Sequence, residues 1–305
     1  MSPLLIAALS ALAFGVSDFV GGLRSRSTHF VWVSLVSQLV VTAGVVVWVV
    51  AFRPGTPTLT GLAWGALAGV GQVLGTLMLM RGLAAGAMHV AGPLAAVVGA
   101  ALPVLVGVLS GERPGPIAWV GVVAALPAVW LVAAGGATEA PDVAGGPGVA
   151  AGPGATPTGP TAPPGAQRLL PPGGRDGILA GLGFALFYVA IARAGESSGG
   201  WPLVFLEVTA LIIMTAVAAW LRPPGRLRDA SGAWLMGTLA LMGTVLYFVA
   251  VHAGMLSLVV VVASLYPAFT VLLAVLVLRE KPSGRQVVGL LLAAASVALI
   301  AAAGS

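Results

Sequence analysis

Two short segments of this chain carry the same pattern: Gly111-Glu112-Arg113-Pro114 and Arg279-Glu280-Lys281-Pro282. Each follows one long apolar stretch and precedes another. A shift of 168 residues places Glu112 on Glu280 and aligns Gly75–Gly136 with Gly243–Gly304 without a gap. A repeat of this length indicates that one supersecondary unit is present twice.

The composition predicts a membrane protein. Of the 305 residues, 59% are hydrophobic and only 8% are charged, whereas about 25% of the residues of a soluble domain are charged. The apolar runs, such as 31–52 and 255–278, are continuous and lack the alternation of barrel strands. Because lipid cannot satisfy backbone polar groups, such runs must form helices. We therefore expect an all-α membrane protein.

Ten apolar segments are long enough to cross the bilayer, which requires about 20 residues each. They lie at 3–22, 30–52, 60–82, 88–110, 115–136, 176–195, 201–221, 231–251, 255–278 and 284–304. The stretch 137–175 is rich in Gly, Pro and Ala and lacks periodicity, which predicts a disordered linker. It separates a five-helix repeat at 3–136 from a second at 176–304. Because five is odd, the two repeats enter the membrane from opposite sides and are expected to be inverted.

The basic residues predict the orientation. Eleven of the 14 Lys and Arg residues follow odd-numbered spans, and three follow even-numbered spans. By the positive-inside rule, the odd-numbered loops lie in the cytoplasm and both termini lie outside the cell membrane. This placement explains the net charge of +5 without a nucleic-acid partner.

The sequence lacks the residue patterns expected for metal binding, phosphate binding and catalysis. The chain has no cysteine, and its three histidines lack metal-ligand spacing. It has neither a phosphate-binding Gly-Lys-Ser/Thr motif nor an acid–base pair or nucleophile motif. We expect no metal, no cofactor and no enzymatic activity, and a solute or proton gradient as the source of energy.

The doubled pattern resembles the EamA-type transporters of the drug/metabolite transporter (DMT) superfamily. The residues that carry the resemblance are Gly86, Pro103, 111–114 and Gly121 in the first half, and Gly254, Pro267, 279–282 and Gly289 in the second. It covers nearly the whole chain outside the linker. The resemblance implies a ten-helix secondary transporter, often an exporter of amino acids, metabolites or toxic compounds, and it implies no particular solute.

Glu207 is the first candidate for the transport pathway. It lies about 9 Å inside the seventh span at 1.5 Å per residue, where a charge costs about 2.5–3.5 kcal/mol. We hypothesise that Glu207 binds a cationic group of the solute or a coupling proton. Arg193 is a candidate charge partner, and a structural ion pair with it is the alternative.

Asp18, near the inner end of the first span, is the second candidate. Arg81 is its candidate charge partner, and interfacial solvation is the alternative. Four further polar residues are costly to leave unpaired in lipid and are expected along the pathway: Gln38, Gln72, Tyr188 and Tyr247.

Proline and glutamate mark the ends and bends of spans four and nine. Pro103 and Pro267 are predicted helix breaks, because each lacks a backbone donor. Glu112 and Glu280 are interpreted as structural, since a carboxylate at a corner favours the positive end of the following helix.

Together these features predict a carrier that moves a small organic solute by alternating access, with export as the expected direction. Its partners would be the solute, the lipid bilayer and protons. Two alternatives stay open: a translocator of lipids or lipid-linked sugars, and a non-transporting membrane scaffold or accessory subunit.

Overall fold

A computed structural model describes residues 2–53, 55–84, 88–136, 173–195, 198–279 and 282–303. These residues form helices and connecting turns, which confirms the predicted all-α class. The helices are α1 Pro3–Ser25, α2 Phe30–Phe52, α3 Leu59–Ala84, α4 Met88–Leu109, α5 Pro116–Gly136, α6 Gly174–Arg193, α7 Trp201–Leu221, α8 Trp234–Ala253, α9 Leu256–Ala263, α10 Tyr266–Val277 and α11 Gly284–Ala303, with a short 3-10 helix at Leu227–Ala233. The predicted linker up to residue 172, Gly86, Glu280 and Lys281 lie outside the described residues.

Ten helical segments of the described chain are long and apolar enough to cross a membrane, which confirms the predicted number. The ninth of them, Leu256–Val277, is made of α9 and α10. The break between these two helices lies at Ser264 and Leu265, directly before Tyr266 and Pro267.

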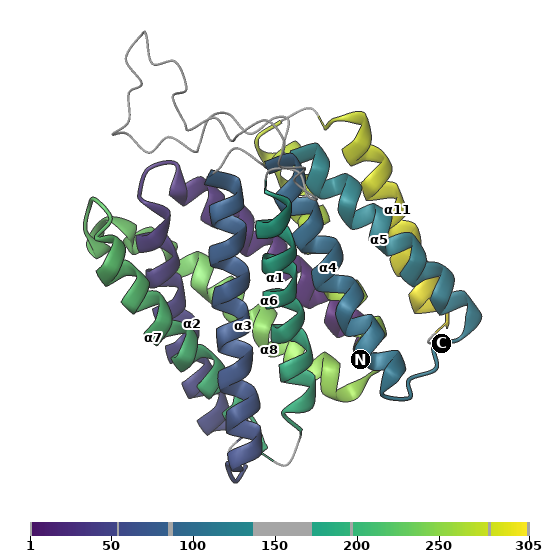
Figure 1. Cartoon of the computed structure of the whole chain (residues 1–305), viewed down its shortest axis with the longest axis horizontal. Coiled ribbons are helices and arrows are strands. Elements are labelled where there is room, and N and C mark those ends of the chain that lie inside the picture. Colours follow the sequence, from purple (N-terminus) through teal and green to yellow (C-terminus); the bar gives the residue numbers. More distant parts are fainter. Residues whose placement is uncertain are drawn as a thin grey trace, which may run out of the picture.

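The helices stand side by side in one bundle, with α2 and α7 at one edge and α5 and α11 at the other (Figure 1). Between these edges, α3 packs against α6 and α7, while α8 packs against α1 and α2. The sequence repeat relates α3 to α8, α6 to α1 and α7 to α2. The two halves therefore use the same set of helix contacts.

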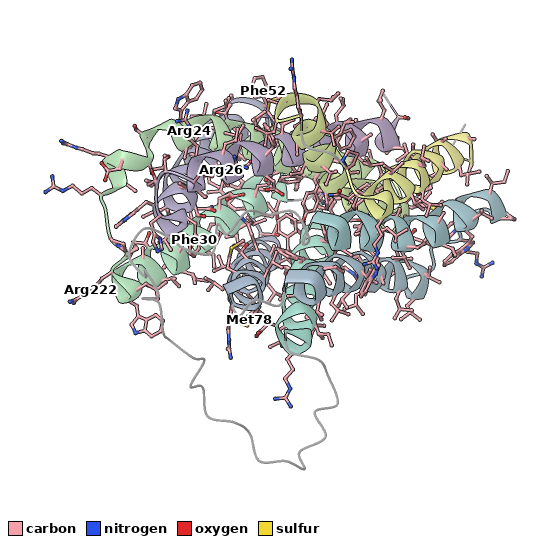
Figure 2. The ribbon with its side chains drawn as sticks, turned by 90° about the horizontal axis from the view of Figure 1, so that it is seen from above. Arg24, Arg26, Phe30, Phe52, Met78 and Arg222 are labelled. Carbon is pink, nitrogen blue, oxygen red and sulfur yellow. The ribbon has the colours of Figure 1, made fainter. Side chains whose placement is uncertain are left out.

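Contacts between helix starts and loops define two ends of the bundle. In the first turn of α2, the Trp32 indole donates to the Pro224 carbonyl, in the loop after α7, at 3.1 Å. At the other end, the Trp201 indole donates to the Gly55 carbonyl at 2.9 Å. We call the first the basic end, because it carries Arg24, Arg26, Arg81, Arg175, Arg222, Arg226 and Arg228. Figure 2 views the bundle from above, and the labelled Arg222 projects from its edge.

A matched pair of contacts relates α5 to α11. Gly121 of α5 lies against Ile300, and Gly289 of α11 lies against Val132. The shift of 168 residues exchanges Gly121 with Gly289 and Val132 with Ile300. Repeat counterparts that pair in this way run antiparallel about a two-fold axis perpendicular to the helices. This packing supports the predicted inverted repeats.

Small residues set the close approach of α3 to its neighbours. Gly61, Gly65 and Gly69 recur every four residues, a spacing that predicts tight helix packing in membranes. A Cβ on Gly65 or Gly69 would collide with the carbonyl oxygens of Pro202 and Leu206 in α7. The stripe therefore faces α7 inside the bundle.

Candidate functional site

A cavity of about 220 Å³ lies between the two halves. Its lining comes from α1, α3, α4, α5, α6 and α10: Asp18, Leu79, Gly92, Ala95, Ala96, Val132, Ala133, Phe184, Tyr266, Pro267, Thr270 and Val271. The lining residues of α3 and α5 are near the last turns of these helices, and those of α4 are in its first turns. The cavity therefore lies in the part of the bundle nearer the basic end.

Asp18 supplies the charge of this cavity. Its helix is fixed against α10, because Thr270 Oγ1 donates to the Gly15 carbonyl at 3.1 Å and Gly15 leaves no room for a side chain beside Phe269. The Asp18 side chain is exposed and has no hydrogen bond or ion pair within the described part of the chain. It is thus free to meet whatever enters the cavity.

Arg81 does not pair with Asp18 as expected from the sequence. Its Nε lies 3.6 Å from Oδ1 of Asp176, and the Arg81 side chain is 72% exposed. The reason is position: Asp176 lies in the first turn of α6 beside the end of α3, whereas Asp18 faces the cavity.

Tyr188 and Tyr247 meet at the centre of the bundle. The Tyr247 hydroxyl donates to the Tyr188 carbonyl at 3.2 Å, and the two ring centroids are 5.0 Å apart. Phe187 stacks on Tyr247, which is fully buried. Tyr188 lies one turn beyond Phe184 toward the opposite end. The pair therefore closes the bundle beyond the cavity.

The short helix α9 seals the same region, since all of its residues are buried. Its own N-cap, Met255, makes no side-chain capping bond. Glu112 takes this role from the other half of the chain: Oε1 accepts from the Leu256 N–H at 2.6 Å and Oε2 accepts from the Ser257 N–H at 2.9 Å. A carboxylate is stabilising at the positive end of a helix. The expected dipole partner was the following helix, α5, and the structure corrects it to α9.

The end of α4 is shaped to present this carboxylate. Gly111 has a φ of +97°, the Gly111 N–H donates to the Val108 carbonyl at 3.0 Å, and the Glu112 N–H donates to the Gly107 carbonyl at 3.1 Å. These bonds form a Schellman motif. A Cβ on Gly107 would also collide with the Glu112 carboxylate. Two glycines thus permit one glutamate to reach α9.

Glu207 lies apart from the cavity, at the contact of α7 with α2. It is fully buried. The Gln38 side-chain amide donates to Oε2 at 2.5 Å, while Oε1 has no hydrogen-bond partner among the described residues. The expected partner Arg193 instead donates to Ser110 Oγ at 2.8 Å, because the end of α6 faces α4 here. The predicted pairing of Glu207 with Arg193 of α6 is therefore wrong, and the partner of Glu207 is Gln38 of α2.

The remaining pathway candidates are dispersed. The ninth span is interrupted directly before Pro267, as expected, whereas α4 continues through Pro103 as one helix. Pro103 removes one backbone bond, and the packing of α4 on its neighbours keeps the helix whole. Gln72 is half-buried and does not line the cavity.

Two cavity-lining aromatics were not among the ranked candidates. Nothing in the sequence singles out Phe184, because it sits in an apolar stretch. Tyr266 does carry a signal: it directly precedes Pro267, at the break of the ninth span.

This fold and site define a class: a multi-pass helical membrane protein with a cavity between two repeated halves. Residues 177–302 match the model of the EamA-like transporter family. The match confirms the resemblance over these residues, which make up most of the second predicted repeat.

Solved structures show the same fold. One crystal structure, described only as that of a protein, has a TM-score of 0.67 at 17% sequence identity, and the alignment covers 97% of this chain and 95% of that chain. At this identity the likeness establishes the fold alone. The comparison with curated proteins yields no match.

Proposed function

We propose that this chain is a secondary carrier that moves a small organic solute across the cell membrane by alternating access, in the direction of export. The observation that carries the proposal is the cavity of about 220 Å³ between the halves, with Asp18 inside it and a buried layer of Tyr247 and α9 beyond it. A cavity near one end and a seal toward the other is one of the two arrangements that such a carrier alternates between.

The contact of Glu112 with α9 supports this mechanism. It joins the end of α4, in the first half, to the start of α9, in the second half, at the end opposite the cavity. If the halves rock against each other, these two hydrogen bonds must break when the opposite end opens. Glu112 therefore acts as a latch that favours the arrangement described here.

Glu207 is proposed to hold the coupling proton. The carboxyl group is sealed from the cavity, and Gln38 donates to only one of its oxygens. An ionised carboxylate buried with a single neutral donor is costly, whereas a protonated one is not. Glu207→Gln is expected to alter both the transport rate and its pH profile. A rate and pH profile equal to those of the wild type would remove this role.

The proposed function is tested by uptake and efflux in proteoliposomes. A broad panel of amino acids, amines, organic acids and toxic small molecules is applied with and without a pH gradient, beside a fluorescent-lipid translocation assay. Movement of at least one solute supports the carrier. Movement of lipid alone favours the lipid translocator, and movement of nothing favours the scaffold.

A further inference from the structure

The charge of the cavity selects among classes of solute. Asp18 is the one carboxylic acid in the lining, and no Lys, Arg or His joins it among the described residues. Since Asp18 has no ion pair there, its charge is left for a solute to neutralise. A charge within the membrane region is stabilised only by a partner or by water.

In the part of the chain that the structure describes, the same cavity offers few hydrogen-bond donors and no positive charge to an anion. The first turn of α10 lines the cavity, and the positive end of a helix ordinarily favours anions. Here, however, Pro267 has no N–H, and the Ala268 N–H already donates to the Leu265 carbonyl at 3.0 Å. The break before α10 therefore offers few donors, and Asp18 repels a negative group.

The rest of the lining selects for a small apolar body. Phe184 and Tyr266 bring aromatic rings, which attract cations, and most of the other lining residues are aliphatic. The volume of about 220 Å³ is below the range of about 300–1,000 Å³ for drug-sized ligands. One carboxylate balances one positive charge, so a dication would carry an uncompensated charge into the bundle.

We propose that the solute is a small organic monocation, an ammonium or quaternary ammonium group on an apolar or aromatic body, and that Asp18 binds its charge. This inference rests on the proposed carrier function. It goes beyond that function because a carrier of anions or neutral metabolites would have the same fold.

Binding of benzyltrimethylammonium to the purified full-length chain in nanodiscs tests the class directly. Choline and dimethylbutanol (3,3-dimethylbutan-1-ol) serve as competitors. Dimethylbutanol is the uncharged carbon isostere of choline, so the two molecules have the same shape and differ in charge. Three variants accompany the wild type: Asp18→Asn, Asp18→Glu, and Asp176→Asn as an acid of the same end outside the cavity. We expect choline to compete and dimethylbutanol not to compete. Asp18→Asn should weaken binding by at least about tenfold, because the charge interaction is lost.

The other outcomes are equally distinct. Asp18→Glu keeps the charge and should bind more tightly than Asp18→Asn. Asp176→Asn should stay within about threefold of the wild type, a shift of less than about 1 kcal/mol. Equal competition by choline and dimethylbutanol in the wild type overturns the inference even if no variant folds. If the proteoliposomes move other solutes while these cations do not bind, only the solute class is wrong. If they move nothing, the carrier function itself fails.

Discussion

Gly183 of α6 lies directly against Gly75 of α3, where a Cβ on Gly183 would approach the Gly75 Cα to 2.7 Å. The contact is backbone to backbone, so no side-chain rotation can relieve it. The shift of 168 residues relates Gly75 to Gly243. Gly243 lies against Phe14 as Gly75 lies against Phe184. The repeat counterparts Gly75 and Gly243 thus each lie against a phenylalanine, one on each side of the bundle centre.

Gly183→Ala should destabilise the protein, because the added methyl group forces α3 and α6 apart. Overpacking of this kind typically costs about 1–3 kcal/mol. Thermal unfolding in detergent, followed by size-exclusion chromatography, measures the effect. Gly22→Ala is the matched control, since nothing lies within 4 Å of a Cβ at Gly22. Equal melting temperatures for the two variants would contradict the close packing.

Gln38→Leu should also lower the stability. It removes the donor to Glu207 Oε2 and leaves a buried carboxyl group without its partner, which costs about 1–3 kcal/mol. The double variant Gln38→Leu with Glu207→Leu should recover most of this loss, because replacing both partners by apolar groups leaves nothing unsatisfied. A double variant less stable than Gln38→Leu alone would show that the pair does not act as one unit.

Loss of the Glu112 carboxylate should open the end opposite the cavity. The chain has no cysteine, so a single Ser257→Cys substitution reports on this end by its reaction with a thiol reagent. Ser257 is fully buried, and labelling should be slow in that background. Adding Glu112→Ala removes a cap worth about 0.5–2 kcal/mol and should speed the labelling several-fold. An unchanged labelling rate would leave Glu112 as a corner residue without a latch function.

The orientation of the chain gives a simple prediction. A reporter fused after Ser305 should be active only if it is exported, because the positive-inside rule places the C-terminus outside. Paired alkaline phosphatase and green fluorescent protein fusions measure this in intact cells. Fluorescence without phosphatase activity would reverse the orientation and would place the cavity on the outer side.

Much of the fold is predictable from this sequence because lipid imposes strict rules on it. Continuous apolar runs predict the number of spans, which the structure confirms, and the repeat seen at Glu112 and Glu280 predicts their division into halves. Side-chain partners follow different rules. Glu207 binds Gln38 rather than Arg193, because helix rotation and packing decide which residues meet.

The sequence predicts a residue of the candidate site only where that residue differs in chemistry from its apolar neighbours. Asp18 stands out as an acid in an apolar span, and Tyr188 and Tyr247 stand out as buried hydroxyl groups. The hydrogen bond from the Leu256 N–H to Glu112 joins the two halves, and its partners are 144 positions apart in the sequence. No local pattern in the sequence encodes such a contact, because it depends on how the two halves pack against each other.

Alternation of the two halves can be tested with a reversible lock between them. The variant Glu112→Cys with Ser257→Cys places one thiol on each side of the contact between the carboxylate and the N-terminus of α9. A bifunctional thiol reagent that reduction removes links the two. Transport of the solute found in the panel is measured in proteoliposomes before cross-linking, after it, and after reduction, beside both single-cysteine variants. We expect transport to fall to background when the thiols are linked and to return on reduction. Full transport by the linked protein would contradict alternating access.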